Sequence, residues 1–227
     1  MSSPGRPLRK EEAWRGMAWA GALLWAACCA GAEAAAMKKW VLPDCPVRRG
    51  RQICLLAAAA AGGALSGWLA AGCTEPAYQL RGMLTLAVVG AGAATDLFQR
   101  RIPNLCSLVL AAGAAVCAAL DLALAPETAG PVLCSGLLGG VILLAGLSLC
   151  RRLSRGGVGV GDIKLVSASA LVMGLYGGLA MLLFAQAAAV LAAVGLLISG
   201  RAKWRDSLPF APFLWLGLLL CLILGTY

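Results

Sequence analysis

Apolar residues along this chain gather in long uninterrupted blocks, and the charged residues are confined to short stretches between them. Blocks of about 17–25 residues without charge are typical of transmembrane helices. The pattern predicts seven such spans, at residues 53–72, 82–98, 104–124, 131–150, 162–176, 177–199 and 208–225. We therefore expect an all-α fold, a polytopic transmembrane helical bundle, because helices satisfy their own backbone hydrogen bonds in lipid.

Another apolar block, residues 17–36, follows a basic N-terminal stretch and has three interpretations. It is a cleaved or surface leader that resembles a signal peptide, an eighth span, or part of an over-extended start for which Met37 is the alternative first residue. We accordingly divide the chain into a basic, leader-like segment at residues 1–52 and a transmembrane domain at residues 53–227. If the first segment has no role, a chain beginning at Met37 should insert normally.

The positive charges are distributed unevenly between the two sides of the predicted bundle. Counting from residue 53 and alternating sides, the loops at 37–52, 99–103, 151–161 and 200–207 hold 13 of the 19 Lys and Arg residues. The opposite loops hold only Arg81. Since positive loops stay inside, the first side is cytoplasmic. We expect the protein to be a multi-pass protein of the plasma membrane. An eighth span would place the basic residues before position 17 outside, which disfavours it.

Composition excludes several classes of chemistry. The chain is 61% hydrophobic and 13% charged, and it contains no His, which removes His-based triads and most catalytic zinc sites. Ten Cys residues include no CxxC pair, so we expect packing rather than metal binding, and no cofactor. The net charge of +9 lies in loops between spans, a pattern that indicates contact with anionic lipid and not with nucleic acid.

Two aspartates are predicted to meet at the cytoplasmic side. Asp96 comes near the end of the span at 82–98, and Asp162 opens the span at 162–176 after the glycine-rich sequence GGVGVG at 156–161. Alternation of sides places both at the same membrane depth. Asp121 comes out on the opposite side, where we expect a solvated helix end whose replacement by Ala is nearly silent.

Each aspartate taken alone also has a structural interpretation. Asp96 could be a helix-end acid that pairs with Arg100 at i+4. Asp162 could be an N-terminal acid favoured by the helix dipole. The density of glycines before Asp162 favours the functional interpretation, because glycines let another backbone approach closely and a plain helix start does not need them.

A pair of nearby carboxylates provides hydrolytic chemistry without a metal. Two carboxylates a few Å apart do not both ionise easily, so the pair shares a proton. The ionised member can activate a water as general base while the protonated member polarises a carbonyl. With no His and no metal, this pair is the best-placed hydrolytic machinery in the chain.

These residues resemble a known family. The sequence GVGVGDIKL at 157–165 contains the GxGD signature of intramembrane aspartyl proteases and is similar to the type IV prepilin peptidases in particular. Asp96 followed by RIPN at 101–104, and PFAPFL at 209–214, are two further similarities. Three matches in the family's order extend the resemblance over residues 82–225.

The resemblance implies an aspartic endopeptidase that cleaves the basic leader from prepilin- or pseudopilin-like proteins at the cytoplasmic membrane face. It implies that Asp96 and Asp162 are the catalytic pair. The motif residues expected to support them are Gly159, Gly161, Lys164, Pro103 and Asn104. Lys164 would hold its helix against headgroups or tune the pair, while Pro103 and Asn104 would fix the turn after the Asp96 helix.

The resemblance also sets limits. Long members of the family carry a domain with two CxxC pairs and methylate the new pilin N-terminus, but residues 37–81 have no such spacing. The chain is therefore similar to the short, protease-only form, and methyl transfer is not expected. Two alternatives stay open at this point: a proton- or ion-coupled transporter with paired intramembrane acids, and a non-catalytic membrane assembly factor.

Overall fold

The structure, a computed structural model, describes residues 8–43, 49–70, 76–155, 157–201, 203 and 207–225, and within them every regular element is a helix. Gly156 and the basic residues Arg6, Arg48 and Arg205 lie outside the described residues. In chain order the elements are α1 (Leu8–Ala36), the π-helix η1 (Met37–Val41), α2 (Arg49–Ala70), α3 (Pro76–Gln99), α4 (Asn104–Leu124), α5 (Pro126–Leu153), α6 (Val160–Ile198) and α7 (Ala211–Leu224).

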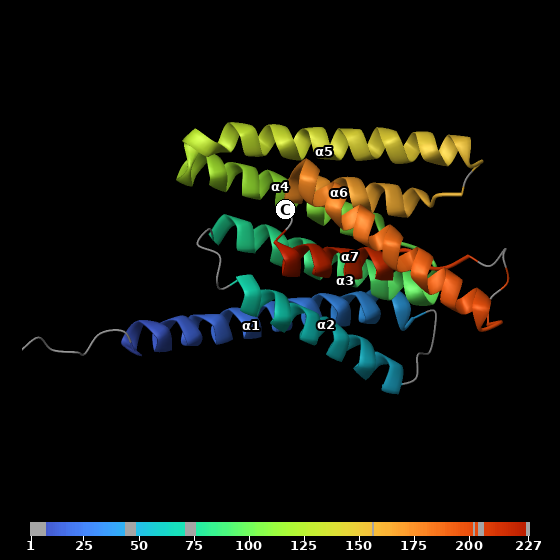
Figure 1. The fold of residues 1–227 in the computed structure, drawn as a ribbon, viewed down its shortest axis with the longest axis horizontal. Helices are drawn as coiled ribbons and strands as arrows, with labels where there is room; N and C mark the ends of the chain where they lie inside the picture. The colour runs from blue at the N-terminus through green and yellow to red at the C-terminus, as the bar shows by residue number, and fades with distance from the viewer. Residues whose placement is uncertain are drawn as a thin grey trace, which may run out of the picture.

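The helices form a bundle with α3 and α7 at its centre (Figure 1). Helices α1 and α2 pack against each other on one side of this centre, and α4, α5 and α6 pack on the other. The core between the helices is filled by fully buried side chains from α3, α4, α6 and α7: Leu86, Leu110, Leu165, Leu214 and Leu218. The all-α prediction is confirmed, and α3 and α6, which carry the two candidate aspartates, contact each other directly.

Several helices are long and apolar enough to cross a membrane. In the part of the chain that the structure describes they are Trp19–Val41, Gln79–Gln99, Asn104–Leu124, Pro126–Leu153 and Val160–Ile198, with Ala211–Leu224 as a shorter apolar helix. The protein is therefore a multi-pass membrane protein. The number of seven spans stays a prediction.

The block at residues 17–36 is built into this bundle as part of α1. Helix α1 packs along α2 and α3, and it buries Ala22, Trp25 and Cys29. Glu33, the one acid within residues 17–36, is also buried, beside Gly90 of α3. Residues 17–36 therefore pack within the bundle, and the three interpretations of this segment stay predictions.

Two predicted boundaries differ from the observed ones for local reasons. The loop expected at 125–130 shortens to Ala125, because Pro126 occupies the first turn of α5, where its missing N–H costs no hydrogen bond. The helix of the last span starts at Ala211 and not at residue 208, with Phe210 as its N-cap: the Phe210 carbonyl accepts the N–H groups of Phe213 and Leu214.

Helix α6 bends sharply at Gly174, two residues before the boundary that the sequence predicted between two spans. Gly174 has φ 82° and ψ 174°, a conformation that only glycine adopts readily. The N–H of Leu175, freed by the bend, donates to the Ser135 hydroxyl of α5 at 3.1 Å. The bend divides α6 into a first arm before Gly174 and a second arm after it. Gly178 of the second arm packs against Ala170 of the first, so that α6 folds back toward the end of the bundle where it began (Figure 1).

Replacing Gly174 by Ala should destabilise the protein by about 1–3 kcal/mol, because the new Cβ forces a strained backbone. That Cβ would also lie 2.9 Å from the Ser135 hydroxyl oxygen. Thermal unfolding in detergent measures the effect. The matched control is Gly195→Ala in the second arm, where a Cβ meets nothing within 4 Å. Equal melting temperatures for the two variants would contradict a bend at Gly174.

The structure corrects the expectation for Asp121, which is buried and not solvated. Its carboxylate forms an ion pair with Arg81 of α3, a residue 40 positions earlier. The Arg81 guanidinium also donates to the carbonyl of Val172, next to the bend in α6. The ion pair, together with the contact to Val172, therefore connects α3, α4 and α6.

The basic stretches converge at one end of the molecule. The C-terminal ends of η1, α3, α5 and α6 all lie at this end in Figure 1, as the alternation of sides predicted. The described Lys and Arg residues near these ends are Lys38, Lys39, Arg100, Arg101, Arg151, Arg152, Arg155, Arg201 and Lys203. In the described helices from α2 onward, only Arg81 of α3 lies toward the opposite end, so this part of the bundle has one strongly basic end. The start of α1, which carries Arg9, Lys10 and Arg15, lies at the opposite end (Figure 1).

Candidate active site

Asp96 and Asp162 lie together at the basic end of the bundle. Asp96 is on the last turn of α3 and is 7% exposed, while Asp162 is half-buried on the first turn of α6. The two carboxyl groups are close enough for the charge of Asp96 to act on Asp162. Leu165 and Ile102 fill the space beside them, against Gly92 of α3. Residues 66 positions apart in the sequence thus form one acidic pair.

Asp96 is held by the start of α7. The backbone N–H of Ala211 donates to Oδ2 of Asp96 at 3.1 Å. This N–H belongs to the first turn of a helix, where no intrahelical acceptor is available, and such a terminus favours a negative charge. Arg100, the partner of Asp96 in the structural interpretation, acts on Asp96 through its charge and donates a hydrogen bond to the Ser207 hydroxyl at 2.8 Å.

The glycines before Asp162 are needed for close approach. A Cβ on Gly159 would lie 2.6 Å from Oδ2 of Asp162, and a Cβ on Gly161 would lie 3.1 Å from Cβ of Ile102. Any side chain at Gly159 would therefore displace the carboxylate. The loop is also fixed from α5, because Arg151 donates to the carbonyl oxygen of Val158 at 2.6 Å.

The other motif residues join the start of α6 to the start of α4. Lys164 donates from Nζ to Oδ1 of Asn104 at 3.1 Å, and both side chains are exposed. Pro103 precedes Asn104 with an extended backbone, and its carbonyl accepts the N–H of Cys106. Ile102 lies between this turn and Gly161, so the sequences RIPN and GVGVGDIKL are in direct contact.

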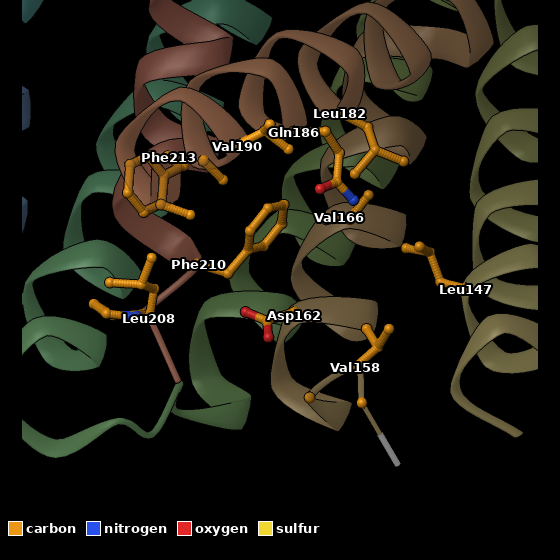
Figure 2. A pocket seen from close by; sticks show the side chains of 15 residues that line it. Leu147, Val158, Asp162, Val166, Leu182, Gln186, Val190, Leu208, Phe210 and Phe213 are labelled. Atoms are coloured by element: carbon orange, nitrogen blue, oxygen red, sulfur yellow. The ribbon is translucent and has the colours of Figure 1, made fainter. Parts of the chain in front are cut away.

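A cavity of about 460 Å³ opens beside Asp162. Side chains of α5, both arms of α6 and the segment before α7 line it, among them Val166, Leu182, Phe210 and Phe213 (Figure 2). Phe210 lies directly before Ala211, which holds Asp96. The cavity therefore has Asp162 in its wall, and Phe210 connects it to the residue that holds Asp96.

Two features of the candidate site were not assigned from sequence. One is the Ala211 N–H, a backbone group with no side-chain signal; only the PFAPFL motif marked its neighbourhood. The other is Gln186, which lines the same cavity as Asp162. Its signal is a lone carboxamide deep in an apolar span. Among the described residues, no cluster of three His, Cys, Asp or Glu side chains is placed to hold a metal ion.

The fold and the site define a multi-pass membrane protein with a paired-acid centre at one end of its bundle. The family model described as "Type IV leader peptidase family" matches residues 83–199, just over half of the chain. The chain therefore belongs to the type IV leader peptidase family and is a membrane peptidase, as the motif resemblance implied. Comparison with curated proteins gives no match, and comparison with solved structures gives none.

Proposed function

We propose that the protein is an aspartic endopeptidase that removes the basic leader from prepilin- or pseudopilin-like proteins, with Asp96 and Asp162 as its catalytic pair. The observation that carries the proposal is that these two carboxyl groups, from α3 and α6, lie near each other at the basic end of the bundle, with Asp162 at the edge of an apolar cavity. Both acids lie within residues 83–199, the part of the chain that the family model matches. An isolated buried acid in a membrane helix is costly, and acids that persist there usually have a function.

In the proposed mechanism the pair shares one proton, and the two acids titrate as a unit. The ionised carboxylate takes a proton from water as the water oxygen attacks the carbonyl carbon of the scissile peptide bond. The protonated carboxyl donates a hydrogen bond to the carbonyl oxygen. As the C–N bond breaks, a carboxyl proton passes to the leaving amine, which restores the pair.

We place the reaction at the cytoplasmic face of the plasma membrane. The pair lies at the same end of the bundle as the basic loops, and basic loops mark the cytoplasmic side. A substrate with a basic leader and an apolar helix would keep its leader in water and its helix in lipid. The bond between them would then reach the depth of Asp162. Methyl transfer is not part of the proposal.

Cleavage of a defined substrate tests the function. Purified protein in liposomes is incubated with a small protein that has a basic leader, a glycine and then an apolar helix. We expect a single cut between the glycine and the helix, located by mass spectrometry. In sealed vesicles, cleavage is expected only when the cytoplasmic face is outward. No cleavage, or cleavage from the opposite face, would contradict the proposed function or its sidedness, respectively.

A further inference from the structure

The cavity beside Asp162 has a second polar group. Among its described lining residues, Asp162 and Gln186 carry polar side chains, and the others are apolar or glycine. In Figure 2 the Gln186 carboxamide points into the cavity, toward the end that holds Asp162, with the Phe210 ring between them in this view. The cavity is therefore an apolar chamber with one acid at its edge and one amide further along its wall.

Gln186 lies in the second arm of α6, within a span long and apolar enough to cross a membrane. Its side chain is exposed, and in the described part of the chain no hydrogen bond to it is seen. An exposed carboxamide in the wall of an apolar cavity has its donor and its acceptor available to a ligand that enters the cavity.

The ligand that fits this pair of groups is a peptide backbone. A carboxamide carries both a donor and an acceptor, which match the C=O and N–H of a peptide unit. A substrate cleaved beside Asp162 must have a stretch of unpaired backbone there, and such groups need partners in lipid. The apolar part of the substrate, on the C-terminal side of the cut bond, is the part suited to the apolar walls formed by Val166, Leu182 and Phe213.

We propose that Gln186 is a positioning residue that hydrogen-bonds the substrate backbone a few residues C-terminal to the cut, while the cavity walls hold the adjacent apolar side chains. The inference rests on the proposed peptidase function and extends it to the binding of the apolar side of the substrate. The basic leader, by contrast, would remain at the basic end of the bundle, away from Gln186.

Photocrosslinking tests this placement without depending on turnover. A photoreactive amino acid is placed at position 186 in an Asp162→Asn chain and exposed to the substrate. The matched control carries it at Leu183, which lies in the same arm, is 68% exposed and does not line the cavity. We expect crosslinks from position 186 to the first residues of the apolar helix, and none from position 183. Crosslinks to the leader alone, or equal crosslinking from both positions, would overturn the proposal.

Kinetics separate a hydrogen bond from a merely structural role. Gln186→Leu should lower kcat/KM about 10-fold, the size expected for one lost hydrogen bond. A set of substrates then removes one backbone N–H at a time. In each of them, one of the first four peptide bonds after the cut is replaced by an ester. At one position, the ester should weaken cleavage by the wild type and leave the Gln186→Leu variant unaffected. If every ester lowers cleavage by both proteins equally, the proposal is wrong.

These outcomes are distinguishable from failure of the proposed function. If the wild type cleaves the substrate but neither crosslink nor ester effect involves Gln186, only the positioning role falls. If the wild type cleaves none of the prepilin-like substrates, both proposals fall together. Leu183→Ala serves as the activity control and should cleave at the wild-type rate.

Discussion

Replacing Asp162 by Asn should abolish leader cleavage, and replacing Asp96 by Asn should do the same. Asparagine keeps the shape of each side chain but removes the shared proton, so water activation and carbonyl polarisation are both lost. Positioned proton transfer contributes about 10²–10⁴-fold to a rate, and each single variant should lose at least this factor. The measurement is initial cleavage of the prepilin-like substrate by purified variants in liposomes.

The double variant provides the sharper readout of a shared mechanism. Two residues that act as one unit are not additive, so Asp96→Asn with Asp162→Asn should be no slower than either single variant. Glu127→Gln is the matched acid-to-amide control, because Glu127 is exposed on the first turn of α5. It should cleave normally. Wild-type cleavage by either single aspartate variant would show that the pair is not catalytic, and the Asp96 contact with Ala211 would then be structural.

Sequence patterns predicted a helix well where the length of the apolar block and the positions of the flanking prolines indicate the same boundaries. The span at 104–124 coincides with α4, since a proline precedes it and another follows the single residue after it. The same reasoning brought Asp96 and Asp162 to one end of the bundle, because alternation of spans depends only on counting. Both are properties of local sequence, and neither requires knowledge of which helices touch.

Features that depend on contacts between distant segments were not predictable in this way. Gly174 and Gly178 are both glycines within the same apolar stretch, so the sequence does not indicate which of them bends the helix. The bend is at Gly174, where Ser135 of α5 packs and accepts the N–H of Leu175. The Ala211 N–H that holds Asp96 is present at the start of every helix, so its role depends on where α7 begins relative to α3. The charge count disfavoured residues 17–36 as a span, and the small residues through which α1 packs against α2 carry no charge signal.

The error over Asp121 has the same origin, and it reverses a predicted outcome. Pro126 and Glu127 follow Asp121 closely, which suggested a solvated helix end. Its partner Arg81 is on another helix, and the side chains of the two residues are only 13% and 11% exposed, Arg81 first. Asp121→Ala should therefore be strongly destabilising and not silent.

Breaking this ion pair from one side leaves a guanidinium buried without its counter-charge. Loss of one partner from a buried pair costs about 3–5 kcal/mol, which is a large part of the stability of a typical domain. The expected result for Asp121→Ala is a marked fall in melting temperature in detergent. Because Arg81 also bonds the Val172 carbonyl next to the bend, cleavage should fall with it as the two arms of α6 lose their alignment.

A compensating variant distinguishes the charge from the packing. Replacing a buried pair by apolar residues of similar volume is often neutral, so Arg81→Met combined with Asp121→Leu should recover most of the stability that Asp121→Ala loses. Glu127→Ala, at the same end of the bundle but exposed, should melt like the wild type. If Asp121→Ala has the melting temperature of the wild type, the ion pair does not contribute to stability, and the interpretation of Asp121 as a solvated helix end is correct. If the apolar double variant stays as unstable as Asp121→Ala, the loss comes from side-chain volume and from the Val172 contact, and the uncompensated charge is not its cause.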